Sequence, residues 1–391
     1  MPNSFSPFAS RISRLASSPI REILHVLEKP SMISFAGGLP AVDSFPSLDL
    51  TEVPASALQY GPSEGDRVLR ERIATNLNSI GLVVEPEQVF VLSGSQQGID
   101  LVAKLFIEKG VRVALEAPTY LAALQVFRLF GADFFEFSPN KPKALSNYSG
   151  SIPLLYVNPT FQNPTGYCYN AKQRVELAKI CDTRDIVVFE DDPYRDLAYA
   201  ACDTTPIVSS LQSDRWVYQS SFSKTFAPGL RIGYLVCGKP LTKYFSRLKQ
   251  AADLHSNRLS QHLICRHFYN DEHAARLIAL QNSYREKRDM FQHYLSKHLH
   301  SHAKWSVPQG GLFFWLDLTL PYAVDTRELL QMTIEKSVAF MPGEPFFADS
   351  VPARNQFRLN FSLASEQEMD EGLKLIRACL DDYGDKTARS A

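Results

Sequence analysis

The sequence predicts an α/β protein in which a large domain with a seven-stranded, mostly parallel sheet is joined to a smaller α+β domain. Two observations predict this fold class. Between residues 88 and 237, short apolar or β-branched runs alternate with segments of helical periodicity, which is the pattern of a mostly parallel sheet covered by helices on both faces. Beyond residue 300, strand-like runs and helices follow one another without that regular alternation, as in a separate α+β layer.

The large domain contains most of the expected elements. Its seven expected strands are Gln88–Leu92, Val111–Leu115, Asp133–Phe137, Ile152–Val157, Ile186–Glu190, Trp216–Gln219 and Ile232–Cys237. Helices are expected between them at Gly98–Lys109, Leu121–Phe130 and Lys172–Cys181. The charged region Lys239–His300 that follows is expected to form one extended helix with a bend.

The smaller domain is expected to combine four strands with two helices. The strands are Trp305–Val307, Leu312–Asp317, Val338–Met341 and Gln356–Phe361, and the helices are Asp325–Ser337 and Glu366–Asp382. We therefore expect three parts: an amino-terminal arm with part of the small domain at 1–53, the large domain at 54–285 and the small domain at 286–391. The arm is expected to pack against the small domain or to cross the cleft between the domains.

Histidines gather near the expected end of the long helical region, at positions 298, 300 and 302, with His293 nearby. No cysteine or carboxylate stands beside them at metal-ligand spacing, so we expect a solvated helix terminus there and no metal site.

Composition excludes several classes of protein. The 391 residues include 41 Lys+Arg and 42 Asp+Glu, for a net charge of −1, which offers no basic surface for nucleic acid or membrane. Uninterrupted apolar runs, such as Leu312–Leu316, are too short to span a bilayer. The 6 cysteines form no C-x-x-C pair, as expected of reduced thiols in a cytoplasmic protein.

The amino terminus has two interpretations. Residues 1–21 contain Arg11, Arg14 and Arg21 and no acid, the composition of a mitochondrial transit peptide. The alternative is a surface arm followed by a helix, since Ile20, Ile23, Leu24 and Leu27 have helical spacing after Ser-Ser-Pro.

Three motifs at expected strand ends contain groups suited to ligand binding. Ser93–Gly98 places small residues at the start of a helix, where free backbone N–H groups bind an anion, although a tight turn with a Ser cap has the same pattern. Ala117–Tyr120 offers an aromatic ring either for stacking on a planar ligand or for packing. Asn158–Gly166 is rich in turn formers and contains two asparagines.

A fourth motif contains three consecutive acids, Glu190, Asp191 and Asp192, after a buried apolar strand. Carboxylates at the end of such a strand are costly unless a positive group faces them. A protonated ring nitrogen or a metal ion would serve, and a helix-capping cluster is the structural alternative.

The fifth motif, Ser220–Tyr234, indicates a specific cofactor. It places Lys224 close to Ser221 and Ser223 and seven residues before Arg231. A lysine in cationic company has a lowered pKa and is a good imine-forming nucleophile. Hydroxyls and a guanidinium bind a dianionic phosphate. Lysine, phosphate site and ring-facing acid together indicate pyridoxal phosphate.

The fifth motif, S-F-S-K-x-x-A-P-G-L-R-I-G-Y, resembles the lysine motif of the fold-type-I, class I/II aminotransferases, and the preceding motifs occur in the same order as in that family. Four further segments resemble the subgroup that contains 2-aminoadipate and kynurenine aminotransferases: Lys29–Leu39, Gln59–Gly65, Gln309–Trp315 and Val338–Gly343. The resemblance extends from about Arg11 to Leu380.

The resemblance implies roles for individual residues. Lys224 would form the aldimine with the cofactor and later carry the proton to and from the substrate α-carbon. Asp191 would pair with the pyridine nitrogen, Asn163 and Tyr194 would contact the phenolic oxygen, and Tyr120 would stack on the ring. The residues implied to hold the phosphate are Ser95, Gln96, Ser221, Ser223 and Arg231.

The resemblance also implies how substrate and a second subunit take part. Tyr60 would reach the phosphate of the neighbouring subunit, which implies a homodimer with shared sites. Arg358, helped by Asn163 and the backbone of Gly38, would bind the substrate α-carboxylate. Arg21 would meet an acidic substrate side chain, which weakens the transit-peptide interpretation.

The implied function is ping-pong transfer of the α-amino group from an L-amino acid (2-aminoadipate-like, aromatic or branched-chain) to a 2-oxo acid such as 2-oxoglutarate. The motifs do not exclude a pyridoxal-phosphate-dependent β-lyase or decarboxylase. A further alternative is a catalytically weak regulatory protein that binds the cofactor. A start of the resemblance near residue 11 and a net charge of −1 argue against the DNA-binding domain that such regulators carry.

Overall fold

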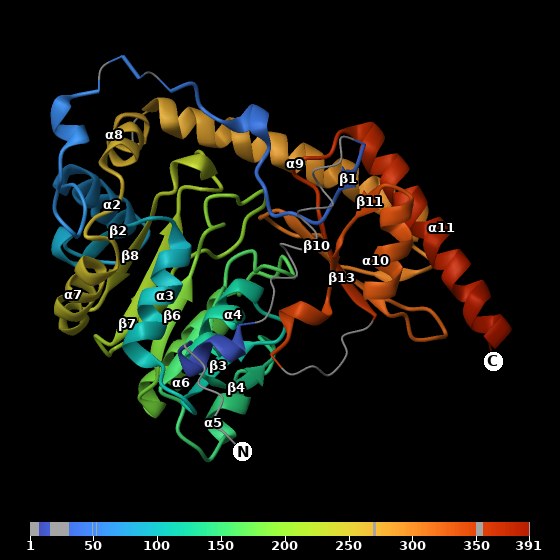
Figure 1. Cartoon of the computed structure of the whole chain (residues 1–391), viewed down its shortest axis with the longest axis horizontal. Coiled ribbons are helices and arrows are strands. Elements are labelled where there is room, and N and C mark those ends of the chain that lie inside the picture. The colour runs from blue at the N-terminus through green and yellow to red at the C-terminus, as the bar shows by residue number, and fades with distance from the viewer. Residues whose placement is uncertain are drawn as a thin grey trace.

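The computed structural model describes residues 8–15, 31–48, 50–51, 53–268, 271–348 and 355–390. Figure 1 shows a large sheet flanked by helices on one side of the molecule and a smaller layer of strands and helices on the other. Short 3-10 helices punctuate the connections: η1 Ser10–Arg14, η2 Val42–Ser44, η3 Ala55–Leu58, η4 Pro86–Gln88, η5 Ile207–Ser210, η6 Pro228–Leu230, η7 Lys239–Leu241 and η8 Glu344–Phe346.

The large sheet has seven strands in the order β2-β8-β7-β6-β5-β3-β4. They are β2 Val89–Leu92, β3 Arg112–Glu116, β4 Asp133–Phe137, β5 Leu154–Val157, β6 Val187–Asp191, β7 Trp216–Ser221 and β8 Gly233–Cys237. Only β8 runs antiparallel to its neighbours β2 and β7. The predicted fold class is therefore confirmed, and the predicted strands differ from the observed ones only at their ends.

Helices cover both faces of this sheet because successive strand residues point to opposite sides. Phe90 and Leu92 pack with α3 Ser95–Phe106, α4 Leu121–Phe130 and α7 Thr242–Asp253 in one apolar cluster. Val89 and Val91 pack on the other face, with α2 Arg67–Ser79, α5 Lys143–Asn147, α6 Ala171–Arg184 and α8 Arg258–His267. The sheet is thus buried on both faces, and its carboxyl-end edge is where polar side chains emerge.

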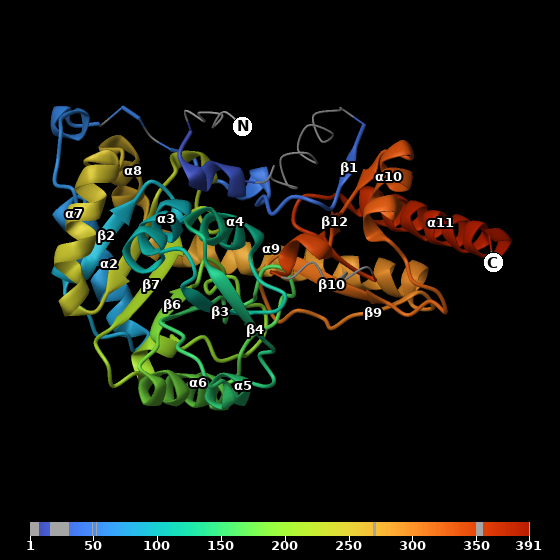
Figure 2. The ribbon, with the colours of Figure 1, turned by 60° about the horizontal axis from the view of Figure 1, so that its bottom comes forward.

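The smaller part is built around a four-stranded sheet in the order β12-β13-β10-β9. Its elements are β9 Ala303–Lys304, β10 Phe313–Leu318, α10 Thr326–Glu335, β12 Met341–Pro342, β13 Gln356–Asn360 and α11 Glu366–Ser390. The long α9 Asp271–Leu299 runs from the large part to this layer (Figure 1), and α11 projects to the carboxyl terminus (Figure 2). The amino-terminal arm joins it, since β1 Ile33–Ser34 pairs in parallel with β11 Val338–Ala339.

Three predicted elements were wrong in detail. The region Lys239–His300 forms three separate helices, α7, α8 and α9, because Leu254 adopts a positive φ of 61° and Asn257 caps the next helix through Ser260 N. The expected strand Trp305–Val307 is irregular, and the strand beside it is Ala303–Lys304. The expected strand Val338–Met341 splits into β11 and β12, which belong to different sheets.

The histidines near the end of α9 were also misjudged as a solvated terminus. His298 and His302 are only 8% and 9% exposed. Their Nε2 atoms lie 2.6 Å from Asp370 Oδ1 and 2.9 Å from Asp381 Oδ1. Both carboxylates come from α11, far along the chain, so no local spacing in the sequence indicated these pairs.

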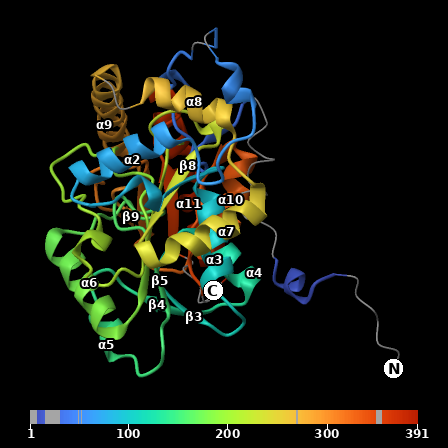
Figure 3. The ribbon, with the colours of Figure 1, turned by 90° about the vertical axis from the view of Figure 1, so that its left-hand side faces the viewer.

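The described amino-terminal segment η1 lies beside α4 (Figure 3), where Arg14 sits close to Gly131. The helix expected over Ile20–Leu27, and with it Arg21, falls outside the described residues. The division at 53 and 285 remains a prediction. In the part of the chain that the structure describes, none of the helices has the length and apolarity needed to cross a bilayer.

Candidate active site

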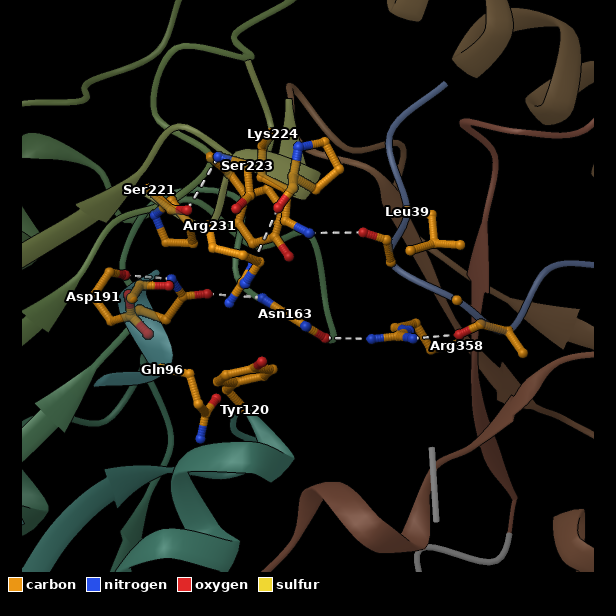
Figure 4. A pocket seen from close by; sticks show the side chains of 18 residues that line it. Leu39, Gln96, Tyr120, Asn163, Asp191, Ser221, Ser223, Lys224, Arg231 and Arg358 are labelled. Carbon is orange, nitrogen blue, oxygen red and sulfur yellow. Dashed lines mark hydrogen bonds between the residues drawn. The ribbon is translucent and has the colours of Figure 1, made fainter. Parts of the chain in front are cut away.

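A cavity of about 290 Å³ lies at the carboxyl ends of the large sheet, facing the smaller part of the molecule (Figure 4). Its lining comprises Ala36, Gly37, Gly38, Leu39, Ser95, Gln96, Tyr120, Asn158, Asn163, Asp191, Pro193, Tyr194, Ser221, Ser223, Lys224, Pro228, Arg231 and Arg358. Every predicted site residue except Tyr60 and Arg21 is therefore among the residues that line it.

Lys224 follows β7 and extends its amine toward the arm. Its Nζ donates a hydrogen bond of 2.7 Å to the carbonyl oxygen of Gly38 and lies 5.8 Å from the ring centre of Tyr194. Burial, and then the positive charges of Arg358 and Arg231, lower the pKa of Lys224 to about 8. A much larger fraction of this amine is therefore neutral and nucleophilic near physiological pH than of a free lysine.

Asp191 ends β6 with a buried carboxylate that is only partly hydrogen-bonded. The hydroxyl of Tyr156 donates to its Oδ2 at 2.8 Å, and Oδ1 finds no hydrogen-bond partner among the described residues. Burial raises the pKa of Asp191 to about 6, although the neighbouring Gln219 and Tyr156 side chains oppose that effect. A cationic N–H placed in the cavity would satisfy the free oxygen and favour its ionised form.

Glu190 and Asp192, the two neighbouring acids of the same motif, accept hydrogen bonds from other parts of the large domain. Glu190 accepts hydrogen bonds from the backbone N–H groups of Ile207 and Val208, at 3.1 and 3.0 Å, at the start of η5. Asp192 accepts one from the Tyr218 hydroxyl at 3.0 Å. The helix-capping interpretation thus holds for Glu190, and only Asp191 lines the cavity.

Arg358 lies on β13, across the cavity from the large sheet, and its guanidinium is held on several sides. Nη1 donates to Oδ1 of Asn163 at 2.6 Å, and Nη2 donates to the carbonyl oxygen of Ala36 at 2.5 Å. The guanidinium carbon stands 4.2 Å from the ring centre of Phe313 and 5.2 Å from that of Phe346. Burial lowers the pKa of Arg358 to about 10, so it remains positively charged at neutral pH.

Asn163 is fixed by a second asparagine. Oδ1 of Asn158 accepts a hydrogen bond of 2.8 Å from the backbone N–H of Asn163, and Asn158 also donates to the carbonyl oxygen of Asp191. A polar chain therefore links the end of β6 to Arg358 through the two asparagines.

One end of the cavity is suited to an anion. Ser95 and Gln96 begin α3, whose N-cap Gly94 has a φ of 81°, so free N–H groups and the positive helix terminus face this end. A Cβ at Gly94 would collide with Nη2 of Arg231, and only glycine lets the guanidinium approach the backbone here. The Ser221 hydroxyl accepts from the Ser223 N–H at 3.1 Å and lies in the same lining.

Two tyrosines flank the centre of the cavity. Tyr120 is half-buried at the N-cap of α4, and Tyr194 packs edge-on against Phe313 with ring centres 5.7 Å apart. Burial raises the pKa of Tyr120 to about 12 and raises that of Tyr194 further above its ordinary value. Both hydroxyls therefore stay protonated at neutral pH and can donate hydrogen bonds.

The remaining predicted residues lie elsewhere. Tyr60 is 77% exposed, outside the cavity, with its ring 5.7 Å from that of His255. Arg21 is outside the described residues.

Sequence reasoning did not assign roles to several residues that shape the site. Tyr156, Asn158, Phe313 and Phe346 were not singled out as supports of Asp191, Asn163 and Arg358. A signal was present for Tyr156, because it places a hydroxyl within an otherwise apolar strand. The packing of Phe313 and Phe346 around Arg358 depends on the tertiary fold and had no local signal.

The residues present fit pyridoxal phosphate. Asp191 Oδ1, which has no hydrogen-bond partner among the described residues, suits a protonated ring nitrogen, the Gly94 and Arg231 end suits a phosphate, and Lys224 lines the same cavity. A mostly parallel seven-stranded sheet with such a lysine site at its carboxyl edge is the arrangement of the pyridoxal-phosphate-dependent enzymes of fold type I.

Comparison with known proteins agrees with this class. The family "Aminotransferase class I and II" matches residues 51–376, and the chain belongs to this family. It is a pyridoxal-phosphate-dependent transaminase.

Three relatives illustrate the similarity. The 2-aminoadipate transaminase of Thermus thermophilus is 34% identical, covering 95% of this chain and 96% of its own. Aromatic-amino-acid aminotransferase 1 of Thermococcus litoralis is 33% identical, covering 94% and 93%. The solved kynurenine aminotransferase of Pyrococcus horikoshii, in complex with PMP, superposes with a TM-score of 0.89 at 31% identity, covering 96% and 97%.

Proposed function

We propose that this transaminase moves the α-amino group of an L-amino acid with a 2-aminoadipate-like, aromatic or branched-chain side chain to a 2-oxo acid such as 2-oxoglutarate, in two half-reactions. The convergence of Lys224, Asp191 and Arg358 on one cavity carries this proposal. The relatives named for aromatic amino acids, 2-aminoadipate and kynurenine support this range of donors.

The cofactor would be held from both ends of the cavity. Asp191 would pair with the ring nitrogen, Asn163 and Tyr194 would contact the phenolic oxygen, and Tyr120 would lie against the ring face. The groups that would hold the phosphate are Ser95, Gln96, Ser221, Ser223 and Arg231. Pyridoxal phosphate, when bound, acts as an electron sink that stabilises negative charge at the substrate α-carbon.

Arg358 would bind the substrate α-carboxylate through its guanidinium. It already holds Asn163 Oδ1 and the Ala36 carbonyl, so its planar head is oriented before substrate enters, and little rotamer entropy is lost on binding. A backbone N–H at Gly38 would complete the carboxylate site. Fixing the carboxylate and the amine together orients the α-C–H bond toward Lys224.

Lys224 would remove and return the proton at the α-carbon. The amine lies 5.8 Å from the ring centre of Tyr194, and its lowered pKa leaves it able to accept a proton near neutral pH. Leaving its hydrogen bond to the Gly38 carbonyl oxygen would free the amine to turn toward substrate.

The donor side chain would extend past Leu39, which lines the cavity and is 48% exposed. The aliphatic surface that Leu39 provides suits a long or aromatic side chain. For an acidic side chain, Arg21 would supply the positive charge.

The protein would work as a cytoplasmic homodimer. Tyr60 is exposed and outside the cavity of its own chain, which is consistent with a hydroxyl that contacts the phosphate bound by a second copy. The even charge balance and the six free cysteines are consistent with a cytoplasmic location.

The test is a donor screen of the purified protein loaded with pyridoxal phosphate. Each amino acid is supplied with 2-oxoglutarate, and glutamate, the new oxo acid, ammonia and carbon dioxide are measured. We expect glutamate and oxo acid in equal amounts, and neither with Lys224→Ala. Ammonia or carbon dioxide in place of glutamate would indicate the lyase or decarboxylase alternative, and no turnover with any donor would indicate the regulatory one.

A further inference from the structure

Outside the active site, two cysteines on different loops lie together. Cys168 lies shortly after the turn-rich segment Asn158–Gly166, and Cys202 lies in the connection before η5. The two side chains affect one another's ionisation, and both cysteines are free and half-buried. Cys168 Sγ also lies 3.5 Å from the carbonyl oxygen of Asp203, next to Cys202 in the chain.

A buried arginine fixes the two loops relative to one another. Arg174 of α6 donates to the carbonyl oxygens of Tyr169 and Pro159, at 3.0 and 3.2 Å, on the Cys168 side. It also donates to the carbonyl oxygen of Thr205, at 2.9 Å, on the Cys202 side. The hydrogen bonds of one buried side chain thus connect the two loops that carry Cys168 and Cys202.

The same guanidinium also places a positive charge beside Cys168. Nη2 of Arg174 lies 3.7 Å from Cys168 Sγ. The hydrogen bond with Cys202 and this positive charge lower the pKa of Cys168 to about 7, while the same pairing raises that of Cys202. One thiol of the pair is therefore the nucleophile and the other stays protonated, the arrangement of a reactive and a resolving cysteine.

Charged groups of both signs surround the pair. The Glu190 carboxylate stands behind the guanidinium, 3.9 Å from Arg174 Nη1. Asp203 follows Cys202 and opposes its ionisation. Cys168 itself borders a cavity of about 460 Å³ whose wall includes Lys304, Asp317, Trp305 and Trp315. This cavity is the route by which a small oxidant would reach Cys168.

We propose that Cys168 and Cys202 form a modification site at which a hydroperoxide converts two thiols into a reversible disulfide. The Cys168 thiolate attacks one peroxide oxygen, the O–O bond breaks, and the departing oxygen leaves with the electron pair and takes up a proton. Cys168 is then a sulfenic acid. Cys202 attacks its sulfur, the S–S bond forms, and the hydroxyl leaves as water with the Cys202 proton.

In this reaction the thiol pair loses two electrons, and the peroxide is reduced to water or an alcohol. A dithiol reductant reverses the reaction. Asn163, which lines the candidate active site, lies only a few residues before Cys168 in the chain. This stretch of chain therefore borders both the candidate active site and the cavity next to Cys168.

The experiment uses the reduced, cofactor-loaded protein treated with hydrogen peroxide, followed by alkylation and peptide mass spectrometry. We expect a disulfide between Cys168 and Cys202 within one chain, lost again on addition of dithiothreitol. In Cys202→Ser, Cys168 should accumulate as a sulfenic acid that dimedone traps. In Cys168→Ser, no disulfide should form at Cys202.

Cys265 provides the matched control, since it is also half-buried but burial raises its pKa. Cys265→Ser should oxidise like the unaltered protein, and at pH 7 Cys168 should alkylate roughly ten times faster than Cys265. Equal rates for the two thiols in the unaltered protein, a disulfide to another cysteine or between chains, or no disulfide at all would overturn the proposal.

Discussion

At Lys224, three features of its surroundings act on one amine. Burial and the guanidinium groups of Arg358 and Arg231 favour the neutral form, and the Gly38 carbonyl oxygen accepts its N–H. The amine is a nucleophile only when unprotonated. Its reactivity toward a carbonyl should therefore follow the charges around it, and these can be altered one at a time.

The first prediction concerns pH. In protein freed of cofactor, the rate of pyridoxal phosphate uptake, followed by visible absorbance, should rise with pH and level off above about 8, because the pKa of Lys224 is lowered to about 8. Arg358→Leu removes one positive charge and should move the midpoint to higher pH. The exposed Arg67 offers a control, since Arg67→Leu should leave the midpoint unchanged. A midpoint that stays in place in Arg358→Leu would contradict this account.

The second prediction concerns Asp191, whose Oδ1 is buried without a partner in the described chain. Asp191→Asn keeps the shape but removes the negative charge that would face the ring nitrogen. Loss of a buried charge pair costs about 3 kcal/mol, so kcat should fall at least about a hundredfold. Steady-state kinetics at saturating cofactor measure kcat, and thermal unfolding checks that the variant keeps its fold. Full kcat in Asp191→Asn would refute the pairing.

At the scale of elements, cofactor binding at the turn that leads into α3 is expected to depend on a single glycine. Gly94→Ala should raise the dissociation constant for pyridoxal phosphate about tenfold or more, because the added methyl group would displace Arg231 from the anion site. One charge-assisted hydrogen bond to the phosphate is worth about 1.5–3 kcal/mol. Titration with the cofactor, followed by absorbance, measures this dissociation constant.

A substitution at Gly110 distinguishes the displacement of Arg231 from backbone strain. It has a φ of 86°, close to the 81° of Gly94, but a Cβ there would meet open space. Gly110→Ala should therefore carry a similar strain and bind cofactor normally. The same loss of affinity in both variants would assign the effect to strain and not to Arg231.

Elements were predictable where the local sequence decides them. The seven strands of the large sheet appear as apolar, β-branched runs because parallel strands are buried on both faces. The breaks within Lys239–His300 escaped prediction because they depend on a positive φ at Leu254 and on a cap at Asn257. Likewise, His298 finds Asp370 only because α11 packs beside α9.

The residues of the candidate active site, like the helices and strands, were predictable where the local sequence decides them. Residues that belong to strand-end motifs, such as Lys224, Asp191 and Asn163, could be placed from the sequence by order and resemblance. Supports contributed by other parts of the fold, such as the Phe313 and Phe346 rings around Arg358, could not be placed. A pattern of residues along the chain shows which groups meet at a sheet edge, but not which side chains pack on them.

At the scale of the whole molecule, the site joins two layers. Lys224 and Asp191 come from the large sheet, Arg358 from the small one, and Gly38 from the arm between β1 and η2. The parts of the chain that we propose to bind the carboxylate and the ring therefore lie on opposite walls of one cavity (Figure 4).

We propose that the exposed Tyr60 extends this arrangement to a second copy. Tyr60→Phe should raise the dissociation constant for pyridoxal phosphate about tenfold, the loss of one hydrogen bond to a charged group, and sedimentation should show a dimer. Tyr244, 42% exposed on α7, supplies the control, and Tyr244→Phe should bind cofactor normally. Unchanged affinity in Tyr60→Phe, or a monomeric protein with full activity, would rule out shared sites.

The central claim is amino transfer through Lys224 in two separable halves. The most direct measurement mixes cofactor-loaded protein with an accepted amino acid and no oxo acid, and counts the oxo acid released. We expect one oxo acid per site, then a stop, with no free ammonia and with turnover resuming only when 2-oxoglutarate is added. Continued release beyond one per site, accompanied by ammonia, would contradict the account.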